Sequence, residues 1–269
     1  MLKKITVALS AAALALTAAC GGGTASEDSD TLVVGASPAP HGEILTFVKD
    51  NLAEKAGIDL KIQEFSDYVQ PNLALNDGQL DANFFQHKPY LQDFSSEKGL
   101  KLAWVGDVHL EPLGVYSEKA NTLAALKDGA TVAIPNDATN GARALALLAQ
   151  QDVITLKDGA GVTATERDIT ANPKNLKFKA LEAAQLPRSL QDVDAAVING
   201  NYALAAGLTP AKDALALESA DGNPYANGLV VKAGKESDPQ IVKLLELLRS
   251  PETRAFIEEK YQGSVLPSA

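Results

Sequence analysis

A strand, a turn and a helix are predicted in succession by residues 31–57, TLVVGASPAPHGEILTFVKDNLAEKAG. Residues 31–36 form a short run rich in β-branched side chains, which is typical of a buried strand. The Pro- and Gly-rich residues 37–42 favour a turn, and apolar side chains then recur at helical spacing over 43–56. Gly57 is a typical residue to end that helix. This stretch is therefore expected to be one strand–helix unit of an α/β protein.

The same alternation of short strands and helices continues to the end of the chain. Further strands are predicted at 60–65, 79–85, 100–105, 113–116, 131–134, 176–181, 193–198, 215–217 and 228–232. Further helices are predicted at 69–76, 89–98, 138–150, 202–206, 239–249 and 251–261. This rhythm indicates mostly parallel sheets with helices on both faces. In such folds ligands bind beyond the carboxyl ends of strands or between two units, so the loops after strands are the candidate sites.

The first 30 residues have the pattern of an export signal followed by a tether. Residues 1–19 carry two lysines and then a mostly apolar stretch that is shorter than the roughly 20 residues of a membrane-spanning helix, as in a secretory signal peptide. Small residues immediately before Cys20 resemble a bacterial lipobox, in which that cysteine is acylated, although Thr17 stands where leucine is commoner. The alternative is a plain secreted protein with an incidental cysteine. The composition of residues 20–30 predicts a flexible tether.

Composition and charge exclude several classes of function. Hydrophobic residues make up 46% of the 269-residue chain and charged residues 22%, as in a globular protein. The formal charge of −10 disfavours binding to nucleic acid. Because Cys20 is the only cysteine, the chain forms no internal disulfide and no cysteine-cluster zinc site. We expect an extracytoplasmic protein attached to the membrane through a lipid on Cys20.

Aromatic residues are concentrated between positions 65 and 94. Tyr68, Phe85, His87 and Tyr90 follow or lie near predicted strand ends, so their rings are expected to line one wall of a pocket. Such a wall suits a flexible apolar or thioether side chain. The alternative is that these rings belong to the core, and that is the interpretation we favour for the remaining phenylalanines of the segment, Phe65, Phe84 and Phe94.

A second candidate site lies in residues 134–143, IPNDATNGAR, which predict a strand, a turn and a helix start. Asn136 or Asp137 is well placed to cap that helix. Asn140 and Arg143 lie three residues apart and share one helix face. A helix start and an arginine fork both favour a carboxylate ligand. The alternative is an arginine exposed to solvent on the helix surface.

Two asparagines at strand ends, Asn199 and Asn227, complete the set of candidates. Their amides could bind an ammonium or a carboxylate group, although asparagine at such positions more often serves turns. The sequence carries no catalytic motif of the G-x-S-x-G, H-E-x-x-H or G-x-G-x-x-G type. The three histidines lie far apart in sequence, and we expect neither a metal, nor a cofactor, nor catalysis.

Seven ordered segments resemble the NlpA-type methionine-binding lipoproteins, the substrate-binding components of bacterial ABC importers. The segments are FSDYVQPNLAL (65–75), LDANFFQHKPYL (80–91), VHLEPLGVYSEK (108–119), IPNDATNGARALALL (134–148), NPKNLKF (172–178), AVINGNYA (196–203) and NPYANGLVV (223–231). The resemblance implies a two-lobed fold like that of periplasmic binding proteins, with the ligand in a cleft between the lobes. Lobe one would comprise residues 31–110 plus 229–269, and lobe two residues 111–228.

The resemblance also implies roles for the candidate residues. Tyr68, Phe85, His87 and Tyr90 would surround the side chain of methionine, and Arg143 with Asn140 would bind its carboxylate. Asn199 and Asn227 would hold the amino and carboxylate groups. The implied partners are an ABC permease and its ATPase, and a monomer is expected. Another apolar amino acid or a methionine-containing dipeptide is an alternative ligand, while an extracellular enzyme and a surface lipoprotein for adhesion or signalling are alternative functions.

Overall fold

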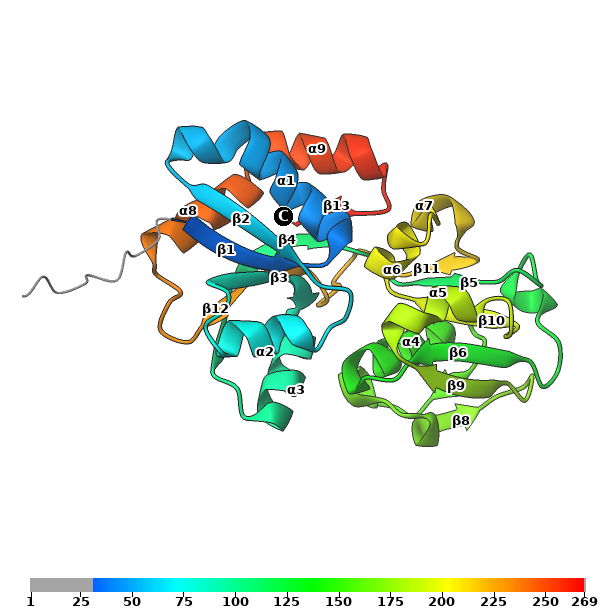
Figure 1. The fold of residues 1–269 in the computed structure, drawn as a ribbon. Coiled ribbons are helices and arrows are strands. Elements are labelled where there is room, and N and C mark those ends of the chain that lie inside the picture. Colours follow the sequence, from blue (N-terminus) through cyan, green and yellow to red (C-terminus); the bar gives the residue numbers. More distant parts are fainter. Residues whose placement is uncertain (1–30, 269) are drawn as a thin grey trace, which may run out of the picture.

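Two β-sheets organise the protein, whose computed structural model describes residues 31–268 (Figure 1). The predicted signal peptide, Cys20 and the tether lie outside the described residues. The six-stranded sheet has the order β13-β4-β12-β3-β1-β2 and forms the first lobe. Its strands are β1 (Thr31–Ala36), β2 (Asp59–Glu64), β3 (Ala82–His87), β4 (Leu102–Leu110), β12 (Asn227–Lys232) and β13 (Leu266–Pro267).

The five-stranded sheet has the order β11-β5-β10-β6-β9 and forms the second lobe. Its strands are β5 (Gly114–Tyr116), β6 (Thr131–Pro135), β9 (Lys177–Leu181), β10 (Ala195–Ile198) and β11 (Ala216–Leu217). A separate hairpin-like pair contains β7 (Thr155–Leu156) and β8 (Ile169–Ala171). The chain crosses from the first lobe to the second between β4 and β5, and it returns between β11 and β12. The expected two-lobed α/β fold is thereby confirmed, while the exact lobe boundaries stay a prediction.

The expectation of mostly parallel sheets is wrong. In the first sheet β1 runs parallel to β2 and β3, but β12 is antiparallel to both β3 and β4, and β13 is antiparallel to β4. In the second sheet β10 and β9 are parallel to β6, whereas β5 is antiparallel to β10 and β11. In the first sheet, β4 and β12 are antiparallel because the chain crosses to the second lobe between them. Because β4 leaves toward the second lobe and β12 returns from it, the two neighbours run in opposite directions.

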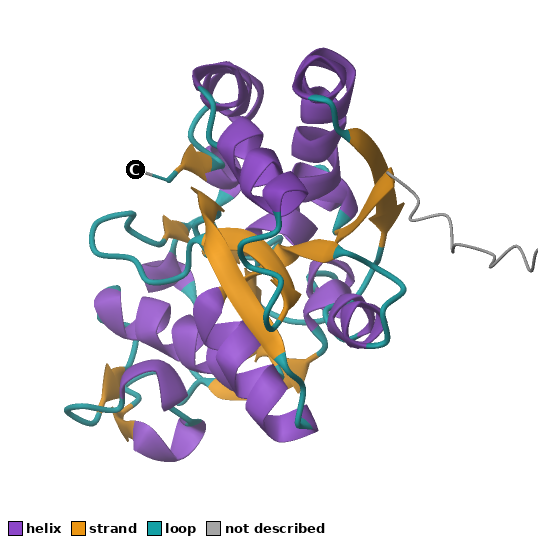
Figure 2. Ribbon diagram, turned by 90° about the vertical axis from the view of Figure 1, so that its left-hand side faces the viewer, coloured by secondary structure: helices purple, strands orange, loops and turns teal. Residues whose placement is uncertain are grey.

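Helices cover both faces of the first sheet, as expected (Figure 2). The helical segment that begins with α1 (Glu43–Val48) continues to Ala56 and packs on one face with α8 (Pro239–Leu248) and α9 (Pro251–Tyr261). On the other face lie α2 (Gln70–Asn76) and α3 (Lys88–Lys98). No helix among residues 31–268 is long and apolar enough to cross a membrane.

The second sheet is also covered on both faces. Leucines of α4 (Ala138–Gln150), the helix expected at these residues, pack on one face. The other face is covered by the short helices α5 (Leu186–Ser189) and α6 (Gly200–Ala205), with α7 (Pro210–Asp213) beside them. Each lobe thus has its own core, and the residues between the two cores are free to form a ligand site.

A close approach between β12 and β4 fixes the position of Asn227, the first residue of β12. Asn227 pairs with His87 of β3 on one side and His109 of β4 on the other, and the register with β4 shifts immediately after it. A Cβ atom at Gly228 would lie 2.2 Å from the carbonyl oxygen of Gly106. Only glycine therefore allows the two strands to meet here.

We expect Gly228→Ala to lower the free energy of unfolding by about 1–3 kcal/mol, because the methyl group would force β12 away from the backbone of β4. Lys232→Ala, at the exposed end of the same strand, is the matched control and should change stability by less than about 0.5 kcal/mol. Urea denaturation measures both values. Equal stability of the two variants would show that the strands adjust without strain.

Candidate functional site

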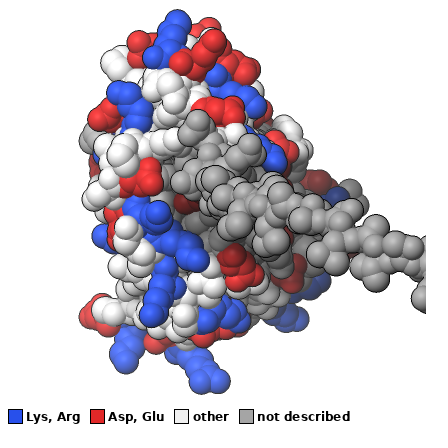
Figure 3. All heavy atoms as spheres, turned by 60° about the vertical axis from the view of Figure 1, so that its left-hand side comes forward, with Lys and Arg blue, Asp and Glu red and all other residues white. Residues whose placement is uncertain are grey.

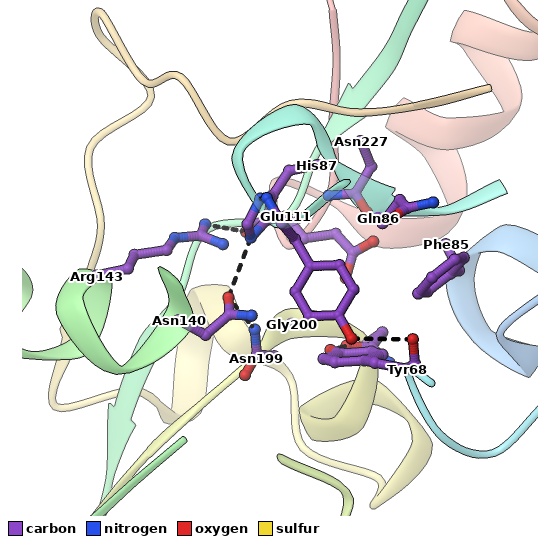
Figure 4. A pocket seen from close by; sticks show the side chains of 12 residues that line it. Tyr68, Phe85, Gln86, His87, Glu111, Asn140, Arg143, Asn199, Gly200 and Asn227 are labelled. Atoms are coloured by element: carbon purple, nitrogen blue, oxygen red, sulfur yellow. Dashed lines mark hydrogen bonds between the residues drawn. The ribbon is translucent and has the colours of Figure 1, made fainter. Parts of the chain in front are cut away.

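One cavity lies between the lobes, and its lining includes all eight sequence-predicted site residues (Figure 4). The lining residues are Tyr68, Phe85, Gln86, His87, Tyr90, Glu111, Asn140, Arg143, Asn199, Gly200, Asn201 and Asn227. The first lobe supplies the aromatic residues, and the second lobe supplies Arg143 and most of the amides. That these residues contact a ligand stays a prediction.

Three aromatic rings form one wall of the cavity. The ring of Tyr68 lies 6.0 Å from that of Phe85 and 5.7 Å from that of Tyr90, measured between centroids. The Tyr90 hydroxyl donates to the carbonyl oxygen of Tyr68 at 3.0 Å, and the Tyr68 hydroxyl donates across the lobes to Oδ1 of Asn201 at 2.6 Å. These bonds hold the rings in place, so the wall is formed before any ligand arrives.

The neighbouring phenylalanines do not line the cavity. Phe84 points to the opposite face of β3 and is fully buried in the core of the first lobe, as side-chain alternation along a strand requires. Phe94 is buried and stacks on Tyr90, with ring centroids 5.7 Å apart. Phe65 packs, partly buried, beside the cluster around Leu75 and Leu80. The expectation that these residues belong to the core is confirmed.

The start of α4 forms the polar side of the cavity. Asp137 caps the helix by accepting from the backbone N–H of Asn140 at 2.9 Å, which confirms one of the two predicted caps. Asp137 also accepts from Nδ2 of Asn140, so Oδ1 of that amide faces the other way. There Oδ1 accepts from Nδ2 of Asn199 at 2.8 Å and from Nε2 of His87 at 3.1 Å. Asn140 therefore connects both lobes.

The ring of His87 is fixed as a neutral donor. Its Nδ1 accepts from the backbone N–H of Tyr90 at 3.1 Å, so the hydrogen of the neutral ring lies on Nε2 and points at Asn140. Burial, followed by the charge of Arg143, lowers the pKa of His87 to about 3. At neutral pH this imidazole carries no charge.

Arg143 is 3% exposed, which excludes the alternative of a solvent-exposed arginine. Its Nε donates to both carboxylate oxygens of Glu218, at 3.0 and 3.1 Å, and its Nη2 donates to the carbonyl oxygen of Glu111 at 2.9 Å. Its guanidinium carbon lies 4.4 Å from the ring centroid of Tyr225. Nη1, in contrast, has no bond among the described hydrogen bonds and remains available to a ligand.

The two candidate asparagines differ in how completely they are bonded. Asn199 is the N-cap residue of α6, and its Oδ1 is buried without a hydrogen-bond partner among the described residues. Asn227 is the first residue of β12, not the residue before it as expected, and its Oδ1 lies 3.1 Å from Nε2 of His41. A buried acceptor without a partner among the described residues can receive a hydrogen bond from a ligand.

Four functional groups were missed by the sequence analysis: Glu111, Glu218, Tyr225 and the pair of His41 with His109. Glu111 is a buried carboxylate in the cavity lining, and both histidine rings contact it. Glu111 and Tyr225 lie inside the segments VHLEPLGVYSEK and NPYANGLVV, but no residue pattern marked them. Glu218 lies 75 positions from Arg143 and outside all seven segments. Except for His109 with Glu111, these contacts join residues far apart in sequence, so rules based on spacing could not find them.

Known proteins resemble this chain over nearly its whole length. The profile of the NlpA lipoprotein family matches residues 32–269. Methionine-binding lipoprotein MetQ of Bacillus subtilis is 43% identical over 255 residues, covering 93% of each chain. D-methionine-binding lipoprotein MetQ of Salmonella typhimurium is 41% identical over 251 residues, covering 93% of this chain and 92% of that one.

A solved structure shows the same architecture. It is a nutrient binding protein from Burkholderia cenocepacia bound to methionine, with 49% sequence identity and a TM-score of 0.86. The match covers 89% of this chain and all of that chain. A profile match over nearly all described residues, together with relatives of such identity and coverage, shows that the chain belongs to the NlpA lipoprotein family.

Proposed function

We propose that this protein captures free methionine outside the cytoplasm and delivers it to an ABC import permease. The observation that carries the proposal is the polarity of the cavity. The rings of Tyr68 and Phe85 lie on one side, and Arg143, Asn140 and Asn199 lie on the other. A zwitterionic amino acid with a long apolar side chain matches this division, because its charged groups and its apolar group lie at opposite ends. The names of the relatives, which are methionine-binding proteins, support the same ligand.

The charged end can bind both groups of an amino acid backbone. Nη1 of Arg143 provides a donor for the carboxylate. Nδ2 of Asn140 and Nδ2 of Asn199 already donate to Asp137 and Asn140, so Oδ1 of Asn199, which has no partner among the described residues, is an acceptor for the ammonium group. Glu111 is the only carboxylate among the described lining residues and provides the charged acceptor for the ammonium group. Asn227 lies beside Glu111 and supplies a further amide. This arrangement selects ligands that carry both charges.

The apolar end must contribute much of the binding free energy. A dissociation constant between 1 μM and 1 nM corresponds to about 8–12 kcal/mol. One charge-assisted hydrogen bond contributes only about 1.5–3 kcal/mol. Contact of a thioether with Tyr68, Phe85 and Tyr90 adds the burial of its apolar surface and sulfur–aromatic contacts of about 0.3–1.5 kcal/mol each. Shorter side chains lose this contribution, which favours methionine over alanine.

Binding without chemistry is the mode that the lining residues support. The described lining contains no serine, threonine, cysteine or lysine, and burial keeps its one imidazole neutral at pH 7. Ligand contacts from both lobes instead favour a closed state over an open one. The Tyr68–Asn201 hydrogen bond shows that the two walls already touch across the cavity. We therefore assign no catalytic residue.

We place the protein at the extracytoplasmic face of the cell membrane, where a lipid on Cys20 would anchor it. Membership in a lipoprotein family supports the anchor. On the face shown in Figure 3, acidic and basic side chains are interspersed, which suits a soluble body. The permease, its ATPase and the monomeric state of this protein belong to the proposal, as does the division into lobes at residues 110/111 and 228/229.

Mass spectrometry of the molecule released on denaturation tests the proposed ligand. The full-length chain, purified without added amino acids, is expected to release methionine in near-stoichiometric amount. Chiral chromatography of the released ligand then distinguishes D- from L-methionine. A dipeptide or another apolar amino acid would replace methionine as the ligand, and turnover of amino acid derivatives would contradict the proposal.

Replacement of the guanidinium tests the carboxylate site. We expect Arg143→Ala to weaken methionine binding at least about tenfold, because a charge-assisted hydrogen bond in a shielded site is lost. Calorimetric titration measures the change. Arg188→Ala, an exposed arginine of the same lobe, is the control and should bind as the unmodified protein does. An unchanged isotherm for Arg143→Ala would remove this residue from the site.

Replacement of Tyr68 tests the apolar end. We expect Tyr68→Ala to weaken methionine more than alanine, because only the longer side chain reaches the ring. Competition binding of the two amino acids measures the difference. Tyr68→Phe keeps the ring and removes the hydroxyl bond to Asn201, so it should retain the preference for methionine. Equal losses for both ligands in Tyr68→Ala would show that the ring does not touch the side chain.

A further inference from the structure

Three buried ionisable residues, His41, His109 and Glu111, are in contact, and Glu111 also lines the cavity. His41 lies in the segment Pro38–Gly42 before α1, His109 lies near the end of β4, and Glu111 follows that strand. Their exposed fractions are 1%, 0% and 5%. Nε2 of His41 lies 3.1 Å and Nε2 of His109 lies 2.8 Å from the same carboxylate oxygen, Oε1 of Glu111. Two imidazoles therefore converge on one oxygen of a residue that lines the ligand site.

The position of the ring hydrogens follows from the surroundings of the other ring nitrogens. Nδ1 of His41 and Nδ1 of His109 are both buried without a hydrogen-bond partner among the described residues. A hydrogen on Nδ1 would be a buried donor with no acceptor, which costs about 1–3 kcal/mol. A hydrogen on Nε2 instead faces Oε1 of Glu111 and, for His41, also Oδ1 of Asn227. Both rings are thus neutral donors through Nε2.

The same observation argues against a metal ion in this cluster. The ligand atoms of the three residues lie within 4.8 Å of one another, and two imidazoles with a carboxylate are a known zinc-binding set. A metal on the two Nε2 atoms would place a hydrogen on each Nδ1. Metal-binding histidines nearly always donate that hydrogen to an acceptor, and residues 31–268 provide none for either Nδ1. The geometry fits hydrogen bonding to the carboxylate better than metal binding.

The electrostatics of the cluster agree with neutral rings around a charged carboxylate. Burial lowers the pKa of His41 to about 4 and that of His109 to about 3. Burial raises the pKa of the Glu111 carboxyl, while His41, the Arg143 charge and the backbone N–H of Asn201 act in the opposite direction. The other titratable groups that face it, Tyr68 and Tyr261, stay neutral because burial raises the pKa of each. Donors to its oxygen keep a buried carboxylate ionised.

Residue 111 also sets the distance between the two charged ends of the site. Its carbonyl oxygen accepts from Nη2 of Arg143, while its side chain is held by the histidines. A Cβ atom at Gly200 would lie 2.8 Å from Cβ of Glu111, so α6 packs directly against this side chain. Oε1 accepts from both rings, and Oε2 lies at the start of α6, 3.2 Å from the position of that Cβ atom. The carboxylate is thus fixed in position from three sides.

We infer that His41 and His109 are positioning residues that hold Glu111 as a fixed, charged acceptor for the ligand's ammonium group. This inference rests on the proposed function and deepens it. Capture then requires a protonated amine on the ligand, and it weakens when the cluster takes up a proton. A ligand that lacks the amine gains nothing from the histidines.

Calorimetric titration of the full-length chain between pH 4.5 and 8 tests the inference, with methionine and with 4-(methylsulfanyl)butanoate, which lacks the amine. We expect His109→Phe to weaken methionine about tenfold at pH 7 and to leave the analogue nearly unchanged. Affinity of the unmodified protein should be constant from pH 8 to 6 and should fall as the pH approaches the Glu111 pKa, which lies above its ordinary value of 4.5. In His109→Phe one donor to the charged form is lost, so this midpoint should rise by about one pH unit.

Two further variants separate positioning from packing. His109→Gln retains an amide donor at nearly the same reach and should restore most of the methionine affinity and the original midpoint. Phe84→Leu is the matched control, because Phe84 packs edge-to-face on both histidine rings and carries no donor. It should lower the melting temperature without moving the midpoint. A midpoint that shifts equally in Phe84→Leu, or equal losses for both ligands in His109→Phe, would overturn the inference.

A measurement without ligand distinguishes failure of the inference from failure of the proposed function. Carbon-13 NMR of glutamate carboxyl groups, assigned with Glu111→Gln, reports the Glu111 pKa directly. We expect it to rise by about one unit in His109→Phe. If methionine does not bind but this shift occurs, the proposed function fails and the positioning role stands. An unshifted pKa, or stoichiometric zinc binding that His109→Phe abolishes, would overturn the inference.

Discussion

A full positive charge is buried between the two lobes, at the guanidinium of Arg143. A buried charge is tolerated only with an opposite charge and further hydrogen bonds around it. Here the partners come from both segments that connect the lobes: Glu111 follows β4, where the chain leaves the first lobe, and Glu218 and Tyr225 precede β12, where it returns. The charge thereby fixes both crossings against the start of α4. The position of the cavity follows from that arrangement.

Neutral, oriented donors are the second feature of the site. Burial keeps His41, His87 and His109 uncharged, and each ring has one nitrogen that donates to a defined oxygen. The oxygens belong to Asn140 and Glu111, which lie in the cavity lining. Groups that are already fixed lose little conformational freedom when a ligand binds, so more of the contact energy appears as affinity. The aromatic wall is held in the same way by the hydroxyls of Tyr68 and Tyr90.

Much of the secondary structure could be predicted from local pattern. The helices at 138–150 and 251–261 and the strand at 31–36 have the expected bounds, because periodicity and capping residues act within a few positions. Strand ends were harder to place. The strand expected to end at residue 105 continues to Leu110 and carries His109, because pairing with β12 extends it past Gly106 and Asp107. Strand direction was also missed, since a crossing between lobes leaves no local signal.

The eight candidate residues were singled out by their types and their places near strand ends and a helix start, while the resemblance of seven segments to a known family implied the two lobes, an amino acid as ligand and the role of each candidate. What the chain's own pattern left open is which partners these residues have. Glu218 meets Arg143 across 75 positions, and His41 meets Glu111 across 70. Ion pairs and hydrogen bonds depend on distances of a few ångströms, and two residues so far apart in sequence reach that distance only when the sheets pair and the lobes pack. The charge state of the site is therefore a property of the folded protein.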